Sequence, residues 1–133
     1  MKYVLDASSI YKLADVNKLD LAMDSITIDL ARYELGNAVL KDCLIHKRID
    51  EAKAQQLIEF LYDIMDNIDT VPIIHGKDVL KTATNLKLSF YDAAYVQYAK
   101  AANLILVTED ERLEKKVKDY IKVTNVGNLL GGM

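Results

Sequence analysis

Short apolar runs alternate along this chain with longer segments in which apolar residues recur every three or four positions. The runs are typical of buried strands and span residues 3–5, 26–28, 71–74, 104–107 and 121–126. Between them, the spacing predicts helices over residues 9–15, 30–46, 51–68, 79–86, 89–102 and 110–118. Strands separated by helices need crossover connections, which join parallel strands. The alternation therefore predicts an α/β fold: a three-layer α/β/α sandwich with a central parallel sheet.

Polar residues in front of the helices predict where several of them begin. Ser8 or Ser9 is expected to cap the first helix, and Asp29 the second. Ser89 is expected to open the helix that follows it. Thr108-Glu109-Asp110-Glu111 has the spacing of a capping box, which predicts Thr108 as the cap of the last helix.

The size and composition of the chain suit one folded domain over residues 1–133, with 51% hydrophobic and 28% charged residues. No apolar run approaches the ~18 residues of a membrane-spanning helix, and the first six residues do not resemble a signal peptide. A single cysteine, Cys43, forms no internal disulfide, so a reducing, cytoplasmic location is expected. The net charge of −3 argues against a protein that binds nucleic acid by bulk charge alone.

Four acidic residues occupy positions that a parallel sheet can bring together. Asp6 follows the first predicted strand, and Asp110 follows the fourth. The carboxyl ends of parallel strands meet at one edge of the sheet, where α/β proteins bind their ligands. Asp92 lies in the first turn of the helix that leads into the fourth strand, so it starts near the same edge. Glu34 lies among mostly apolar neighbours on the second long helix.

Each of these residues, taken alone, also has a purely structural interpretation. Asp6 can cap the turn into the first helix, and Glu34 can be a solvated residue on its helix. Asp92 stands three residues after Ser89, as in a variant of the capping box. Asp110 can be a first-turn acid that the helix dipole favours. The four positions in order carry more weight than any one of them.

Convergence of the four carboxylates would create a site for a metal ion. Several like charges at close range repel one another, which raises their pKa values unless a cation lies between them. Ligand sets made only of oxygen atoms suit hard ions such as Mg²⁺ and Mn²⁺. Because Mg²⁺ often completes its coordination shell with phosphate oxygens, such a site would let an acidic protein act on a phosphodiester.

Four local patterns along the chain carry a resemblance to a known family. They are Asp6-Ala7-Ser8, Glu34 followed by Ala38, Ser89-Phe90-Tyr91-Asp92-Ala93-Ala94-Tyr95 with Ala99, and Thr108-Glu109-Asp110 with Leu113. In this order and at this spacing they resemble the PIN-domain ribonucleases, and within these the VapC toxins of VapBC toxin–antitoxin pairs. The resemblance covers nearly the whole chain, and the block around Asp92 is its most specific part.

The resemblance implies a metal-dependent endoribonuclease that cleaves single-stranded RNA and is the toxin of a toxin–antitoxin pair. Its catalytic residues, which would also hold one or two Mg²⁺ or Mn²⁺ ions, are Asp6, Glu34, Asp92 and Asp110. A metal-activated water would attack phosphorus and leave a 5′-phosphate and a 3′-hydroxyl. Ser8 and Thr108 would orient the carboxylates or a metal-bound water. Some members have a further acid where this chain has Arg112, a departure that concerns the second ion rather than the first.

The resemblance also implies partners. VapC-like proteins usually form homodimers, and a small antitoxin protein lays a helix or an extended tail across the toxin toward its acidic site. A groove for it is expected at the helices over 9–15 and 51–68, whose apolar stripes the core explains equally well. Arg112, Lys115 and Lys116 are candidates to hold the RNA backbone, with a solvated helix face as the alternative.

Two further groups of residues are interpreted as structural. Tyr91, Tyr95 and Tyr98 share one predicted helix and could stack on bases, but packing in the core is favoured. His46 and His75 are interpreted as structural or surface residues, because metal-activated water needs no histidine base.

Competing functions differ in what they require of the first strand end. A haloacid-dehalogenase-type phosphatase needs a second aspartate two residues after Asp6, where this chain has Ser8. A response-regulator receiver needs paired acids after its first strand, and the sequence has no such pair there. Two alternatives stay open: a PIN fold that only binds RNA or a partner, and a housekeeping RNA-processing nuclease.

Overall fold

The computed structural model of the protein describes residues 2–131 and contains a sheet in which every pair of neighbouring strands is parallel. The strands are β1 (Tyr3–Leu5), β2 (Ser25–Ile28), β3 (Asp69–Val71), β4 (Ile105–Val107) and β5 (Val123–Thr124). They are arranged in the order β3-β2-β1-β4-β5. The first strand therefore lies at the centre, and the chain adds strands first on one side and then on the other.

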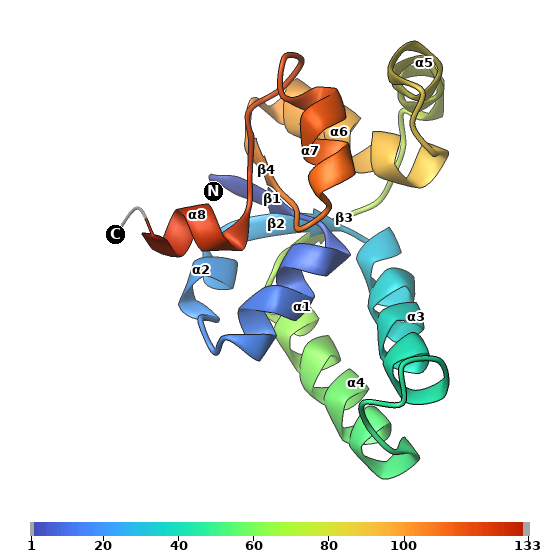
Figure 1. Ribbon diagram of the computed structural model, residues 1–133. Coiled ribbons are helices and arrows are strands. Elements are labelled where there is room, and N and C mark those ends of the chain that lie inside the picture. Colours follow the sequence, from blue (N-terminus) through green and yellow to red (C-terminus); the bar gives the residue numbers. More distant parts are fainter. Residues whose placement is uncertain (1, 132–133) are drawn as a thin grey trace.

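Helices cover both faces of this sheet (Figure 1). They are α1 (Ala7–Asp15), α2 (Asp20–Met23), α3 (Leu30–Leu44), α4 (Glu51–Asp66), α5 (Gly76–Leu86), α6 (Phe90–Ala102), α7 (Glu111–Val117) and α8 (Val126–Gly131). One face carries α1 to α4 together with α8, and the other face carries α5, α6 and α7. The predicted three-layer α/β/α sandwich with a central parallel sheet is confirmed.

Successive residues of the central strands point into two separate cores. In β1, Val4 packs with α5, α6 and α7, whereas Leu5 packs with α1, α3 and α4. Leu106 and Val107 of β4 divide between the two cores in the same way. Because both faces are covered, these strands read as continuous apolar runs in the sequence instead of alternating ones. The two layers hold the ends of β1 and β4 side by side, since these strands pair along their length.

The two outer strands differ from the prediction: β3 begins earlier, at Asp69, and shares only Val71 with the predicted run, and β5 is shorter. The run over 71–74 predicts a strand there, but β3 ends at Val71 and lies at the edge of the sheet. Pro72 has no N–H to donate, so the ladder stops in front of it. The run over 121–126 forms a strand only at Val123–Thr124, because Val126 already begins the short helix α8.

Two of the predicted helix caps are wrong. Asp6, and not Ser8 or Ser9, is the N-cap of α1, and its Oδ1 accepts a hydrogen bond from the N–H of Ser9 at 2.9 Å. Asp110, and not Thr108, is the N-cap of α7, where its Oδ1 accepts from two backbone N–H groups at 3.0 and 3.1 Å. Each helix therefore starts at one of the aspartates of the predicted site, which fixes that side chain relative to the sheet edge.

The other helix starts are closer to the prediction. Ser89 is the N-cap of α6, and its Oγ accepts from the N–H of Asp92 at 3.0 Å, as predicted. Asp29 does stand at the N-cap position of α3, but its side chain makes no capping hydrogen bond. Asp50 caps α4 through a hydrogen bond from the N–H of Lys53 at 2.8 Å.

Two further features concern the single cysteine and the character of the helices. Cys43 is a free, partly buried thiol. Among residues 2–131, no helix combines the length and the apolar character that crossing a membrane requires.

Candidate active site

The four predicted acidic residues lie at or beside the carboxyl edge of the sheet. Asp6 follows β1 directly, and its backbone N–H donates to the carbonyl of Val107 at the end of β4, at 3.2 Å. Asp110 begins α7 after the same strand, Asp92 lies in the first turn of α6, and Glu34 lies on α3. Glu34 interacts electrostatically with Asp6 and Asp92, and Asp92 with Asp110. The structure thus brings all four into one group of interacting charges.

Asp6 is the buried member of this group, with 7% of its surface exposed. Its Oδ1 accepts hydrogen bonds from the Ser8 hydroxyl at 2.7 Å and from the N–H of Ser9 at 2.9 Å. Burial raises the pKa of Asp6, because it removes water from the charged form, while hydrogen bonds from Thr108 and Ser8 partly oppose this. A carboxylate in this setting is well placed to bind a cation that replaces the lost solvation.

Ser8 and Thr108 tie together the two loops that carry Asp6 and Asp110. The Ser8 hydroxyl lies 3.5 Å from that of Thr108 and accepts a hydrogen bond from the N–H of Glu109 at 2.9 Å. The Thr108 hydroxyl accepts from the N–H of Asp110 at 3.1 Å. Thr108 is buried, whereas Ser8 is exposed and lines the large cleft described below. The orienting role of the two hydroxyls stays a prediction.

Tyr95 holds Glu34. Its hydroxyl donates to Oε1 of Glu34 at 2.7 Å, from a ring that is 1% exposed in the core. Partial burial raises the pKa of Glu34, the bond from Tyr95 lowers it, and the charges of Asp6 and Asp92 raise it again. Burial and the neighbouring Glu34 carboxylate raise the pKa of Tyr95, so the phenol stays protonated and remains a donor.

The hydrogen bond from Tyr95 to Glu34 was not predicted, although the burial of the Tyr95 ring was. The sequence places it on the apolar face of a helix, and a ring in that position packs in the core. A buried tyrosine hydroxyl nevertheless needs a hydrogen-bond partner, so a tyrosine three residues after a predicted site aspartate is itself a signal. The partner is 61 positions away in the chain, and only the fold identifies it.

Asp92 and Asp110 form the more open half of the group. Partial burial and the nearby charge of Asp110 raise the pKa of Asp92, while the Ser89 hydroxyl and the ammonium of Lys116 lower it. Asp110 is exposed, and both of its capping hydrogen bonds use Oδ1.

The donor set fits a hard divalent cation held partly through water. Within residues 2–131, no three side chains of His, Cys, Asp or Glu are close enough together to hold a metal ion directly. Three carboxyl groups nevertheless have raised pKa values, and repulsion between them contributes in two cases. Mg²⁺ keeps several of its waters and needs only one or two protein carboxylates. Such an ion would compensate the repulsion without requiring all four side chains as direct ligands.

Two clefts reach this group, and each has different acidic residues in its wall. A large cleft of about 1080 Å³ lies between α1, α3 and α4, and Glu34 and Ser8 line it. A small cleft of about 210 Å³ lies between α7 and the start of α6, and Asp92 and Asp110 line it.

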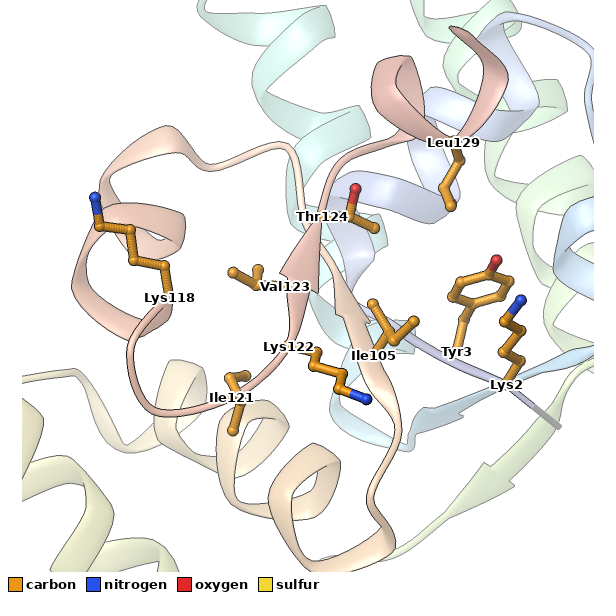
Figure 2. A pocket seen from close by; sticks show the side chains of 9 residues that line it. All are labelled: Lys2, Tyr3, Ile105, Lys118, Ile121, Lys122, Val123, Thr124 and Leu129. Carbon is orange, nitrogen blue, oxygen red and sulfur yellow. The ribbon is translucent and has the colours of Figure 1, made fainter. Parts of the chain in front are cut away.

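A third hollow, of about 430 Å³, lies away from the acidic group, where β1, β4 and β5 begin (Figure 2). Its described lining includes the three lysines Lys2, Lys118 and Lys122 but no carboxylate. Figure 2 shows their ammonium groups pointing in different directions. This hollow therefore offers no convergent set of groups for chemistry.

The structure also shows the exposure of the predicted histidines, of two tyrosines and of Lys115. His46 and His75 are both exposed, as expected of surface residues. Tyr98 is partly buried, whereas Tyr91 is 60% exposed, so core packing is wrong for Tyr91. Lys115 is exposed and does not line the small cleft.

Sequence comparison relates the whole chain to characterised proteins, although no protein-family model matches it. Exonuclease VapC9 of Pyrobaculum aerophilum is 33% identical over 129 residues, which cover 92% of this chain and 91% of that protein. This chain belongs to the VapC family. Ribonuclease VapC3 of the same organism is 30% identical over 128 residues, covering 87% of this chain and 95% of VapC3.

Solved structures agree with the fold of this VapC-family protein. The crystal structure of PAE2754 from Pyrobaculum aerophilum superposes with a TM-score of 0.83 at 28% identity, over 99% of this chain and 96% of that one. The DNA-bound VapBC structure from Salmonella typhimurium has a TM-score of 0.66 at 13% identity, over 94% of this chain and 98% of that one. At 13% identity, the second likeness bears on the fold alone.

Proposed function

We propose that this VapC-family protein is a metal-dependent endoribonuclease that cleaves single-stranded RNA and acts as the toxin of a toxin–antitoxin pair. The names of two relatives, a ribonuclease and an exonuclease, support a nuclease. The observation that carries the proposal is the group of four interacting carboxylates at the sheet edge, three of them with raised pKa values. A non-catalytic binding protein would have no need to keep these repelling charges together.

Two sets of residues would have different roles in this reaction: one would hold the metal, and the other would position the residues that hold it. A Mg²⁺ or Mn²⁺ ion, when bound, would supply a water of lowered pKa as the nucleophile for hydrolysis of the phosphodiester to a 5′-phosphate and a 3′-hydroxyl. The residues that would hold one or two such ions are Asp6, Glu34, Asp92 and Asp110. Ser8 and Thr108 fix the loop of Asp6 against that of Asp110, and Tyr95 fixes Glu34. Pre-positioned carboxylates of this kind need little reorganisation during the reaction.

The large cleft is the proposed place for an antitoxin segment. It is bordered by α1 and α4, the two helices where a groove was predicted, and the 43% exposed Phe60 lies in its wall. A toxin–antitoxin complex from Klebsiella pneumoniae shares the fold, with a TM-score of 0.62 at 14% identity. A peptide that filled this cleft would cover Glu34 and so block access to one side of the acidic group. A homodimer is part of the same proposal, and light scattering of the purified protein measures it.

Cleavage of a labelled RNA tests the function directly. Purified protein, free of any antitoxin, is incubated with a single-stranded RNA in linear and in circular form, with Mg²⁺, Mn²⁺ or EDTA. We expect metal-dependent cleavage of both forms, and none from Asp92→Asn. A circle has no end, so cleavage of the linear form alone would make the protein an exonuclease, as one relative is named.

Two other results would give the proposal no support. No cleavage of several RNAs by folded protein would favour a binding role. Cleavage that survives both EDTA and Asp92→Asn would come from a contaminating nuclease. A gene for a small antitoxin next to this one would separate a toxin from a housekeeping RNA-processing enzyme.

Replacing Tyr95 with phenylalanine tests the positioning of Glu34. The ring stays in the core and only the hydroxyl is lost, so we expect the fold to persist with a loss of about 1–2 kcal/mol in the free energy of unfolding. Without its donor, Glu34 is less well oriented, and we expect cleavage to slow by about tenfold. The Mg²⁺ concentration that gives half-maximal activity should rise, which a merely structural role of Tyr95 would not cause.

Tyr98→Phe is the matched control, because it removes a hydroxyl from the same helix one turn further on. It should leave the Mg²⁺ dependence unchanged. An equal shift in both variants, or none in Tyr95→Phe, would contradict the positioning role.

A further inference from the structure

We propose that the small cleft beside Asp92 and Asp110 binds a phosphate group of the RNA next to the scissile bond; this inference rests on the proposed nuclease function. Three cationic side chains line the cleft together with the two carboxylates: Lys87, Arg112 and Lys116. They come from two separate segments, the turn between α5 and α6 and the helix α7. The fold has therefore gathered them around one space beside the reacting groups.

Lys116 is held in position by the backbone. Its Nζ donates to the carbonyl oxygen of Lys87 at 3.0 Å. Lys87 is the C-cap of α5 and has the left-handed conformation common at helix ends, with φ 57°, so its carbonyl belongs to the turn that ends this helix. An ammonium group has three N–H donors, and this bond uses one of them. Lys116 is thus oriented in the cleft and keeps donors for an anion.

The charges of the cleft favour an anion once the carboxylates are compensated. Lys116 lies near enough to Asp92 to lower its pKa, so positive and negative groups share the site. A divalent cation at the carboxylates would offset the charges of Asp92 and Asp110. The positive charges of Lys87, Arg112 and Lys116 would then have no negative partner in the cleft. A phosphate group would provide that negative charge.

The third hollow shows that lysines alone do not make such a site. It also has three of them, but they point apart and its described lining includes no carboxylate (Figure 2). The size of the small cleft is informative as well. At about 210 Å³ it is below the ~300–1,000 Å³ of pockets that enclose whole small-molecule ligands. It suits a phosphate group with its water more than a complete nucleotide.

Titration with adenosine 5′-monophosphate tests the subsite, with adenosine and the dinucleotide ApA as comparison ligands. Binding of all three ligands is followed by NMR in Mg²⁺, because the cleft is proposed to favour an anion when the carboxylates are compensated, and the same spectra show whether any ApA has been cleaved. We expect the monophosphate to bind and adenosine not to, and Lys116→Met to weaken the binding by about tenfold. Lys118→Met is the matched control, since it removes the same charge two residues on, beside the third hollow, and should change nothing.

The two sources of phosphate give different results. Binding of ApA as well as the monophosphate would show that the cleft takes an internal phosphodiester. Binding of the monophosphate alone would show that it takes a terminal phosphate. Lys87→Asn gives a second variant, because asparagine tolerates the left-handed conformation, and it should also weaken binding.

Failure of this inference is distinguishable from failure of the proposed function. If RNA is cleaved but Lys116→Met and Lys118→Met bind the monophosphate equally well, the subsite is wrong and the nuclease stands. If no RNA is cleaved but Lys116→Met selectively weakens monophosphate binding, the subsite stands and the nuclease proposal fails. Absence of monophosphate binding to folded wild-type protein in Mg²⁺ would also overturn the subsite.

Discussion

Replacing Asp6 with asparagine is expected to slow RNA cleavage by at least about a hundredfold and to leave the protein as stable as before, or more so. Asparagine caps helices as well as aspartate does, and its side-chain oxygen can still accept from the N–H of Ser9. The substitution removes a charge that is buried and whose pKa is raised by that burial. Under the proposed mechanism Asp6 would hold the metal, so its loss should cost more activity than the ~10–100-fold typical of residues one layer further out.

Two further variants separate the roles of Asp6. Asp6→Ala removes both the charge and the cap, so it should also lose about 1 kcal/mol in the free energy of unfolding. Asp50→Asn makes the same chemical change at an exposed cap of α4, where the side chain accepts from Lys53, and should keep full activity. Thermal unfolding measures the stability of each variant, and the initial rate of RNA cleavage measures its activity. If Asp6→Asn unfolds more easily than the wild type, the burial of its charge is not a source of instability.

The order of the elements follows from the sequence because the central strands are buried on both sides. Val4, Leu5, Leu106 and Val107 can only be continuous apolar runs if helices cover each face, and that requirement already implies crossover connections. The outer elements lack this constraint. The helix α8 begins at Val126, whose N–H donates to the side chain of Glu109 at 3.2 Å. This bond joins residues 17 positions apart, so only the fold provides it. Asn125 is the local signal for the same start, because its Oδ1 accepts from the N–H of Asn128 at 2.7 Å, but the apolar run had assigned this segment to the last strand.

The positions of the site residues were predictable, but their double roles were not. An aspartate after a strand marks the sheet edge whether it binds a ligand or caps a helix, and Asp6 and Asp110 stand at positions that serve both purposes. The capping rules favoured Ser8 and Thr108 because these residues have the usual spacing. In the structure their hydroxyls bond to the loops around the aspartates instead. Those two bonds are local, but the contacts of the Ser8 hydroxyl with Thr108 and with the N–H of Glu109 join the two loops. They depend on β1 and β4 lying side by side, which only the folded sheet provides.

Without metal, the acidic group is expected to make the protein more stable as the pH falls from neutral toward the ordinary carboxyl pKa values. Asp6, Glu34 and Asp92 all have pKa values raised above the ordinary 3.8 for Asp and 4.5 for Glu. Between the ordinary and the raised values, the folded protein binds more protons than the unfolded chain, so stability decreases as the pH rises through that window. Above the raised values the full repulsion and desolvation of three carboxylates oppose folding. The melting temperature, measured in EDTA across this range, tests the sign.

Mg²⁺ should remove most of this pH dependence, because it compensates the same charges. At about one hundred times its dissociation constant, a ligand that binds only the folded state adds ~2.7 kcal/mol, or roughly 10 °C for a domain of this size. The gain should be larger at neutral pH than in the acidic range, where protonation of the carboxylates competes with the ion. Asp6→Asn should flatten the profile in EDTA and reduce the gain from Mg²⁺, whereas Asp50→Asn should do neither. A profile in EDTA that rises with pH would show that the raised pKa values of the acidic group do not govern the stability of this protein.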